Sequence, residues 1–122
     1  MNDIQSFRKE KSDYIERLAV KENERVFFLD TNEIYWINSE GNYIEVHTGN
    51  RKHLMRETMN GIEAKLNPKD FVRIRRSTIV RIKQIKELCP LYNGEFAIVL
   101  KNGVKLSSSR HYRKNLDALL KS

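Results

Sequence analysis

Two Asn-Gly dipeptides near the C-terminal end set the strongest limit on what this chain can fold into. Asn93-Gly94 and Asn102-Gly103 each lie between residues that favour β-strands, and Phe96–Leu100 separates them. A two-residue hairpin turn of type I′ requires a positive φ at both central positions, which Asn and Gly tolerate best. The pattern therefore predicts two consecutive β-hairpins and an antiparallel sheet in the C-terminal part.

Short strand-like runs also fill the chain before these turns, so we expect a mainly β fold with eight to ten antiparallel strands. One small helix interrupts them, with Thr58 as its N-cap and Asn67-Pro68 as its stop signal. A second helix is predicted after Ser107-Ser108-Ser109. Its apolar face is expected to carry Tyr112, Leu116, Leu119 and Leu120.

The N-terminal 22 residues are polar and mixed in charge. Ile15, Leu18 and Ala19 are spaced i, i+3, i+4, which predicts a short helix over Asp13–Val20. We therefore expect residues 1–22 to be a linker or a leading helix. Residues 23–122 are expected to be the folded domain.

Positive charge is concentrated after residue 30. Residues 31–122 contain seventeen Lys/Arg and nine Asp/Glu, a net charge of +8, and residues 71–86 contain six Lys/Arg and no acidic residue. β-branched residues alternate with these cations, which is typical of a folded strand that presents charge to a polyanion. Nucleic acid is the leading partner; an anionic membrane is second, because no amphipathic helix with a basic face is evident.

Signatures of an enzyme or of a metal site are missing from the sequence. It contains no GxxxxGK, GxGxxG or HExxH motif, and His47, His53, His111 and Cys89 are scattered. We expect no enzymatic activity, no cofactor and no metal, and we interpret Cys89 as a small packing residue. A single cysteine, no signal peptide and no apolar run of membrane-spanning length favour a cytoplasmic location without membrane contact.

The side-chain alternation of the basic strand predicts which arginines face solvent. Val72 and Ile74 share the inward parity, so Arg73 and Arg75 are expected to point outward. Arg76 has the inward parity as well, which indicates that the strand ends or bends there. An arginine at such a bend can donate two hydrogen bonds to a guanine edge, whereas the plainer interpretation is a solvated basic edge that deters sheet pairing.

Two further segments combine a turn or a helix start with polar side chains. Asn42 is suited to an adenine edge, and Ser107–Arg110 to a phosphate at the start of the last helix. The plainer interpretations are an asparagine favoured by turn geometry and an ordinary N-cap.

Several spaced motifs in one order resemble the LytTR DNA-binding domain, the output module of LytR/AlgR-type bacterial response regulators. They are Ile34-x-x-Ile37-x-x-x-Gly41-Asn42-Tyr43, Leu54-x-Arg56-x-Thr58-Met59, Phe71-x-Arg73-x-x-x-Ser77-x-Ile79-Val80, Ile85, Asn102-Gly103 and Ser109-Arg110. The resemblance implies an elongated arrangement of antiparallel β-sheets, about ten short strands, whose loops enter major grooves of promoter DNA at paired direct repeats. The family usually has His at the position of Arg75 and often Asn at that of Arg81, so this chain carries more charge.

The resemblance also assigns expected roles to individual residues. Base contacts are expected from Asn42, Arg76 and Arg110, and phosphate contacts from Arg73, Arg75, Ser77, Ser109 and Arg113. The implied partner is double-stranded promoter DNA, bound by a transcription regulator. Two further partners stay open: a second copy on the adjacent repeat, and a receiver or sensor region outside this chain.

Two other classes of protein fit the composition. A β-rich RNA-binding or single-strand-binding module would stack bases on exposed aromatic residues. Phe28 and Trp36 lie in apolar runs and are predicted to be core, which favours duplex DNA. A protein-interaction domain whose basic face meets an acidic partner is the third alternative.

Overall fold

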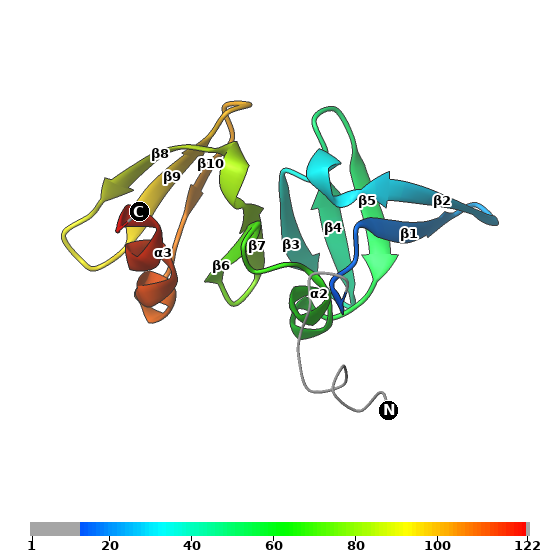
Figure 1. The fold of residues 1–122 in the computed structure, drawn as a ribbon, viewed down its shortest axis with the longest axis horizontal. Helices are drawn as coiled ribbons and strands as arrows, with labels where there is room; N and C mark the ends of the chain where they lie inside the picture. The colour runs from blue at the N-terminus through cyan, green and yellow to red at the C-terminus, as the bar shows by residue number, and fades with distance from the viewer. Residues whose placement is uncertain (1–12, 122) are drawn as a thin grey trace, which may run out of the picture.

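An N-terminal β-hairpin opens the part of the chain that the computed structural model describes, residues 13–121. Strand β1 (Arg17–Glu22) pairs antiparallel with β2 (Arg25–Asp30). Asn23 and Glu24 join the two strands, and both have positive φ (50° and 65°), as a type I′ turn requires. Figure 1 shows this hairpin extending from one end of the molecule.

The predicted helix over Asp13–Val20 is wrong, because the chain from residue 17 is extended in β1. Leu18 and Val20 are buried at 3% and 0% exposure, and Leu18 lies opposite Leu29. This i, i+2 burial against β2 outweighs the helical spacing that the sequence also contains. Strand β1 therefore belongs to the folded domain, while residues 1–12 of the predicted linker lie outside the described residues.

Five strands form the central sheet in the order β5-β4-β3-β7-β6, and every neighbouring pair is antiparallel. Helix α2 (Met59–Lys65) connects β5 to β6 and begins where predicted: Thr58 Oγ1 accepts a hydrogen bond from the N–H of Gly61 (2.9 Å). The strands are β3 (Trp36–Glu40), β4 (Tyr43–His47), β5 (Lys52–Arg56), β6 (Phe71–Arg75) and β7 (Thr78–Arg81).

The C-terminal sheet has the order β10-β9-β8 and contains both Asn-Gly turns. Both predicted hairpins are confirmed, but the type I′ turn expected for them is wrong. Gly94 and Gly103 have positive φ (86° and 92°), whereas Asn93 and Asn102 do not. The N–H groups of Leu91 and Leu100 donate to the carbonyls of Glu95 and Val104, so each turn is a three-residue loop that ends on its glycine. The elements of this part are β8 (Ile85–Pro90), β9 (Phe96–Leu100), β10 (Lys105–Ser107), the 3₁₀ turn η4 (Arg110–Tyr112) and α3 (Arg113–Leu120). Two further 3₁₀ turns are η2 (Thr31–Glu33) and η3 (Ile82–Gln84).

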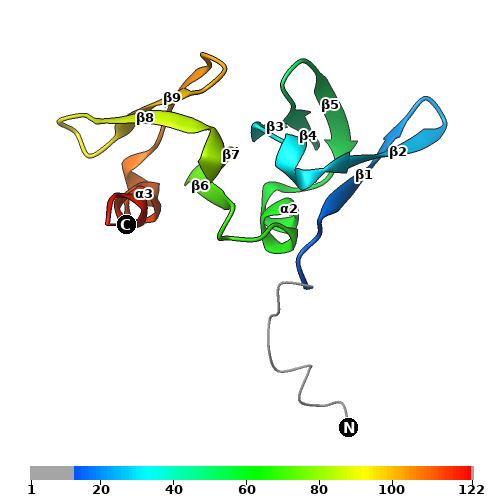
Figure 2. The ribbon, with the colours of Figure 1, turned by 45° about the horizontal axis from the view of Figure 1, so that its top comes forward.

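Strand β6 is buried on both faces because it lies between two hydrophobic cores. Phe71 packs into the core that β1–β5 and α2 share, whereas Val72 and Ile74 pack into the core beneath the C-terminal sheet and α3. The pair β6–β7 therefore joins two parts of the molecule. Figures 1 and 2 show these parts side by side in an elongated arrangement.

The predicted fold class is confirmed: residues 13–121 form ten strands in antiparallel sheets, a small inserted helix and a C-terminal helix. Three side-chain predictions are wrong. Phe28 and Leu120 are 54% and 56% exposed, and Cys89 is exposed instead of packed. Among residues 13–121, no helix has the length and apolar character needed to cross a membrane.

Candidate nucleic-acid interface

Three turns meet at one edge of the molecule. Asn38 of β3 pairs with Thr78 of β7, and the N–H of Ser39 donates to the carbonyl of Ser77 (3.0 Å), so the β3–β4 turn lies beside the β6–β7 turn. The N–H of Ser109 donates to the carbonyl of Ile74 (3.0 Å), which fixes the start of η4 beside the end of β6. We call this edge, formed by Gly41-Asn42, Arg76-Ser77 and η4, the contact edge. Figure 1 shows the β6–β7 turn and α3 on the lower side of the molecule.

Asn42 lies in the two-residue turn between β3 and β4. Gly41 has a φ of 62°, and Glu40 and Tyr43 close the turn as a strand pair. Asn42 is exposed, and nothing lies within 4 Å of a Cβ built on Gly41, so the turn projects freely. Its amide is therefore available to donate and accept hydrogen bonds at a base edge.

A neighbouring cation was missed as a candidate although its motif was noted. Arg56, the last residue of β5, lies opposite Tyr43, and its guanidinium lies 5.8 Å from the centre of the half-exposed Tyr43 ring. Arg56 is exposed, so it adds positive charge beside Asn42. The cross-strand register, which the sequence does not specify, places it there.

Arg76 lies where β6 gives way to the turn that leads into β7. The strand ends at Arg75, with an irregular register between Arg73 and Arg75, so the predicted end of the strand is confirmed. Arg76 and Ser77 are exposed. Within the described part of the chain, no carboxylate lies within 4.0 Å of the Arg76 guanidinium, so its five N–H donors are available to an anion or a base.

Arg73 does not point outward, and this prediction is wrong. Its side chain is 6% exposed, and Nη1 donates to Glu63 Oε1 (2.7 Å) and Asn60 Oδ1 (2.7 Å) of α2. Nε donates to the carbonyl of Arg75 (3.2 Å), and Nη2 donates to the carbonyl of Arg76. Parity failed because β6 is covered on both faces, so an odd-numbered residue is buried as well.

The contacts of Arg73 hold the β6–β7 turn in place. One planar guanidinium bonds two successive carbonyls of the turn and two side chains of α2, an arrangement that a flexible ammonium cannot reproduce. Asn115 of α3 donates to the Arg73 carbonyl (2.9 Å), so the same residue links to the C-terminal helix. Arg73 is thus a positioning residue for the turn that carries Arg76. The sequence offered no signal for this, because its partners come from distant elements.

Arg75 is also engaged within the protein. Nε donates to the carbonyl of Ser107 (2.7 Å) and Nη2 to its hydroxyl (2.9 Å), so the side chain is only partly exposed. These bonds fix the end of β10, from which the chain enters η4. The outward orientation predicted for Arg75 is therefore realised only in part, and its hydrogen bonds give it a structural role.

The three serines before the last helix have separate functions. Ser107 accepts from Arg75, and Ser108 is fully buried, where its Oγ accepts from the N–H of Phe96 (2.9 Å). Ser109 is partly exposed and is the N-cap of η4, but its side chain makes no capping bond. Tyr112, not a serine, precedes α3. The prediction that all three serines form a phosphate-binding site is therefore wrong. Of the three, Ser109 alone lies at the contact edge, and its hydroxyl makes no capping hydrogen bond.

Arg110 is exposed at the first position of η4. A Cβ built on Gly94 would lie 3.3 Å from the Arg110 Cβ, so the β8–β9 turn supports this position. No carboxylate of residues 13–121 lies within salt-bridge distance of Arg110. Arg113 is about half exposed and pairs with Asp117 (3.5 Å), a surface ion pair of the kind that contributes about 0–1 kcal/mol. Lys114 is also exposed.

A polar network lies on strands β3 and β4 of the central sheet. His47 stacks on Trp36 (ring centres 4.0 Å apart), and its Nε2 lies 2.6 Å from Asn38 Oδ1. Burial lowers the pKa of His47 below its usual value of 6.5, with Lys52 acting in the same direction and Glu45 opposing. Burial raises the pKa of Glu45, but hydrogen bonds from Asn38 and Lys52 outweigh it, so the pKa of Glu45 is lowered.

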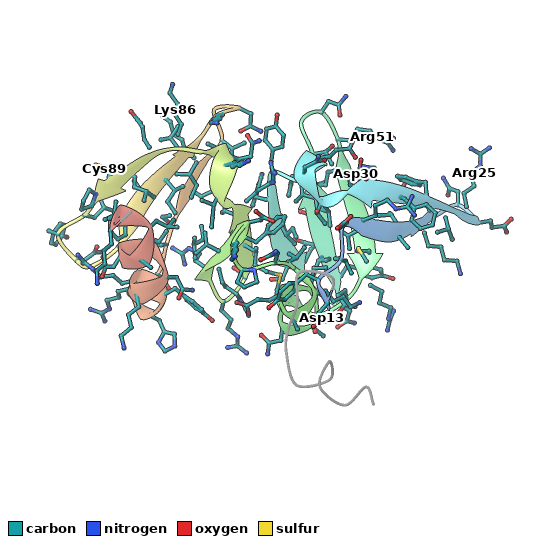
Figure 3. All side chains as sticks on the ribbon, viewed as in Figure 1. Asp13, Arg25, Asp30, Arg51, Lys86 and Cys89 are labelled. Carbon is teal, nitrogen blue, oxygen red and sulfur yellow. The ribbon has the colours of Figure 1, made fainter. Side chains whose placement is uncertain are left out.

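The histidines and the cysteine do not gather into a site. His53 is 2% exposed, and its Nδ1 lies 3.0 Å from Glu22 Oε2, which ties β5 to β1. Cys89 lies on β8, as Figure 3 shows. Across the described residues, no group of three or more His, Cys, Asp or Glu side chains is arranged to hold a metal ion.

Comparison with known proteins gives one consistent result. Residues 24–121 match the family described as the LytTr DNA-binding domain. The chain is 34% identical over 104 residues to the sensory transduction protein LytT of Bacillus subtilis (85% of this chain, 43% of that protein). It is 32% identical over 107 residues to the transcriptional regulatory protein LytR of Staphylococcus aureus (88% and 44%).

The same fold occurs in a solved structure. The LytTr DNA-binding domain of a putative methyl-accepting/DNA response regulator from Bacillus cereus superposes with a TM-score of 0.79. The match covers 88% of this chain and 99% of that domain at 18% identity, and it concerns the fold alone. The chain spans less than half the length of the curated relatives that it matches.

Proposed function

Because this chain belongs to the LytTR family of DNA-binding domains, we propose that it binds double-stranded DNA in a sequence-specific manner as part of a bacterial transcription regulator. One observation carries the proposal: three turns far apart in the sequence converge on one edge and present Asn42, Arg76 and Arg110 to solvent. A major groove about 12 Å wide admits protruding turns of this kind.

Base contacts are assigned to the three residues at the tips. The amide of Asn42 suits an adenine edge, and the guanidinium groups of Arg76 and Arg110 suit guanine. Support comes from the contrast with Arg73 and Arg75, whose donors are already bonded within the protein. Arg76 and Arg110 have no such partner among residues 13–121, so DNA does not have to displace one.

Phosphate contacts are assigned to residues that flank these tips. Ser77 follows Arg76, and Ser109 precedes Arg110, so both hydroxyls adjoin a base-contacting residue. Arg113 follows one turn later, and its pairing with Asp117 is weak enough to exchange for a phosphate. Arg73 and Arg75, which the sequence also suggested, are left out because they bond the turn and Ser107.

Operators are proposed to be paired direct repeats in promoters, each bound by one copy. The relatives that the chain matches are named a sensory transduction protein and a transcriptional regulatory protein, and they are more than twice as long as the matched segment. A receiver or sensor region outside this chain would then control the domain in the cytoplasm.

Selection from a pool of random duplexes, followed by sequencing, tests the proposal. We expect an enriched motif of two similar half-sites about one helical turn apart, because both copies would then face the same side of the DNA. Titration should show tighter binding to the selected duplex than to either of its single strands. No enriched motif at low salt would contradict sequence-specific binding. Tighter single-strand binding with tyrosine quenching would instead support a single-strand-binding module.

A further inference from the structure

The β1–β2 hairpin exposes two large apolar side chains on one strand. Val26 is 56% exposed and Phe28 is 54% exposed. Phe27 lies between them and Leu29 follows Phe28, and both of these side chains pack toward the core. The guanidinium of Arg17 lies over the Phe28 ring, at 4.5 Å. Together they form a small apolar patch on a projecting strand, which another molecule can cover. Figure 3 shows Arg25 at the outer end of this hairpin, far from the sheets.

Strand β2 also has an open hydrogen-bonding edge. It pairs with β1 on one side, and the described part of the chain supplies no strand on the other. Glu22 and Arg25 close the two-residue turn as a hydrogen-bonded pair, so Val26 and Phe28 are at positions that do not bond β1. Their N–H and C=O groups therefore point to the open side, where an extended strand can add.

The charge of the hairpin indicates what kind of strand would add to the open edge of β2. Residues 17–30 contain three Lys/Arg and three Asp/Glu, whereas residues 31–122 have a net charge of +8. Two copies of the domain repel each other over most of their surface, but not at the hairpin. A nucleic acid would gain nothing at this neutral strand, because its binding depends on neutralising phosphates.

We propose that the hairpin is a self-association surface, through which β2 pairs antiparallel with β2 of a second copy. A two-fold axis at Phe27 places Val26 opposite Phe28 of the second copy, and Phe28 opposite its Val26. Both pairs then exchange backbone hydrogen bonds, and each Val26 packs beside the Phe28 of the second copy as a cross-strand neighbour. The strand is thus complementary to itself.

Such an interface is small, so association is weak in free solution. One strand pair buries far less than the roughly 1,200 Å² of a stable interface. Copies on paired direct repeats share one orientation along the DNA, so a two-fold pairing joins domains that are bound to different DNA segments. This use of the surface rests on the proposed DNA binding, whereas the pairing itself does not.

Cysteine cross-linking without DNA tests the pairing. Two variants of the full chain are prepared, V26C and F28C, each with Cys89→Ser to remove the native thiol. Directly opposed residues of a hydrogen-bonded pair have Cα atoms about 5.5 Å apart, within the range of a disulfide. We expect the mixture to form the 26–28 disulfide several-fold more than either variant alone forms its homodimer.

Leu54→Cys, also with Cys89→Ser, is the matched control, because Leu54 is 43% exposed on β5, outside the hairpin. Cross-linking of V26C with F28C no greater than that of L54C would overturn the proposal; the hairpin would then face another partner. Binding to a single selected half-site should be unchanged in Phe28→Lys, whereas bridging of two separate selected duplexes by the protein should fall at least several-fold. A loss at the single half-site would instead count against the separation of the two surfaces.

Discussion

The contact edge and the β1–β2 hairpin are both built from tight turns, but they offer opposite chemistry. The contact edge presents Arg76 and Arg110 without carboxylate partners among residues 13–121, and each lies beside a serine. The hairpin presents Val26 and Phe28 within a segment whose charges cancel. One edge therefore suits a polyanion, and the other suits a neutral strand. In our proposals, DNA contact and self-association therefore use separate turns.

The two regions also differ in how they are held. The β6–β7 turn is fixed by a buried guanidinium, whereas the hairpin is fixed by Leu18, Val20 and Leu29 in the core and by the Glu22–His53 contact. A polar anchor can set a turn to the accuracy that base contacts need, because planar hydrogen bonds are directional. Changes at Arg73 should therefore affect one region and spare the other.

Arg73→Ala is expected to have the largest effect. It removes bonds to two turn carbonyls and leaves Asn60 and Glu63 of α2 without their partner, so unfolding should become easier by about 3 kcal/mol. Urea denaturation checks this. Arg73→Lys keeps the charge but not the planar guanidinium, so it should recover part of the stability. Without the guanidinium the turn is held less accurately, so both variants should show a weaker preference at the base pair that Arg76 contacts.

Arg17→Ala is the matched control in the hairpin, because Arg17 is exposed and lies over Phe28. Its effect on unfolding should stay within about 0.5 kcal/mol. Equal destabilisation by Arg17→Ala and Arg73→Ala would contradict the role of Arg73 as the anchor.

Arg75→Ala should have a smaller effect, about 1–2 kcal/mol, because it removes two hydrogen bonds to Ser107. The loss should be local. Amide hydrogen exchange is expected to speed up in β10 and η4 and to stay unchanged in the β1–β2 hairpin. Unchanged exchange in η4 would show that Arg75 does not position Arg110.

Arg113→Ala should weaken binding to selected and scrambled duplexes alike, and the slope of log K against log salt should fall by about one unit. Lys86→Ala is the control, since Lys86 projects from β8 on the side of Figure 3 opposite to α3. Titrations at several salt concentrations measure both. An equal change in slope for Lys86→Ala would mean that DNA does not bind at the contact edge.

The smallest effect concerns His47, which lies outside both regions. Its pKa in the folded state lies below the usual 6.5, so the unfolded chain takes up this proton first as pH falls, and stability drops below about pH 6.5. His47→Gln keeps a donor for Asn38 but does not titrate. Denaturation at pH 7 and about pH 5 should show a shallower decline for the variant. An identical decline would assign the pH dependence to other groups.

Much of the fold follows from local sequence signals. The two C-terminal hairpins, the Thr58 cap and the end of β6 at Arg75 depend on residues close in the sequence, and each was predicted correctly. The type I′ geometry was not, because Asn-Gly also fits a three-residue loop in which only the glycine has positive φ. The N-terminal hairpin was missed because its turn is Asn23-Glu24, and Glu seldom adopts a positive φ. The helical spacing around Leu18 then dominated the interpretation.

The location of the site was predictable from the sequence, but the orientation of Arg73 and Arg75 was not. Three candidate segments were found, and they converge on one edge, yet alternation alone assigned Arg73 and Arg75 to solvent. Alternation holds for a sheet with one covered face, whereas β6 has a core on each side. Partners such as Glu63 and Ser107 come from other elements, and no local pattern specifies them.

The most direct test compares Arg76→Ala with the unchanged protein on the selected duplex and on a scrambled duplex at the same salt concentration. Because Arg76 is assigned to a base edge, we predict a loss of about 1–3 kcal/mol on the selected duplex and a clearly smaller loss on the scrambled one. Sequence preference should relax at one base pair only. Equal losses on the two duplexes would contradict base contact by Arg76 and leave it a phosphate-binding cation.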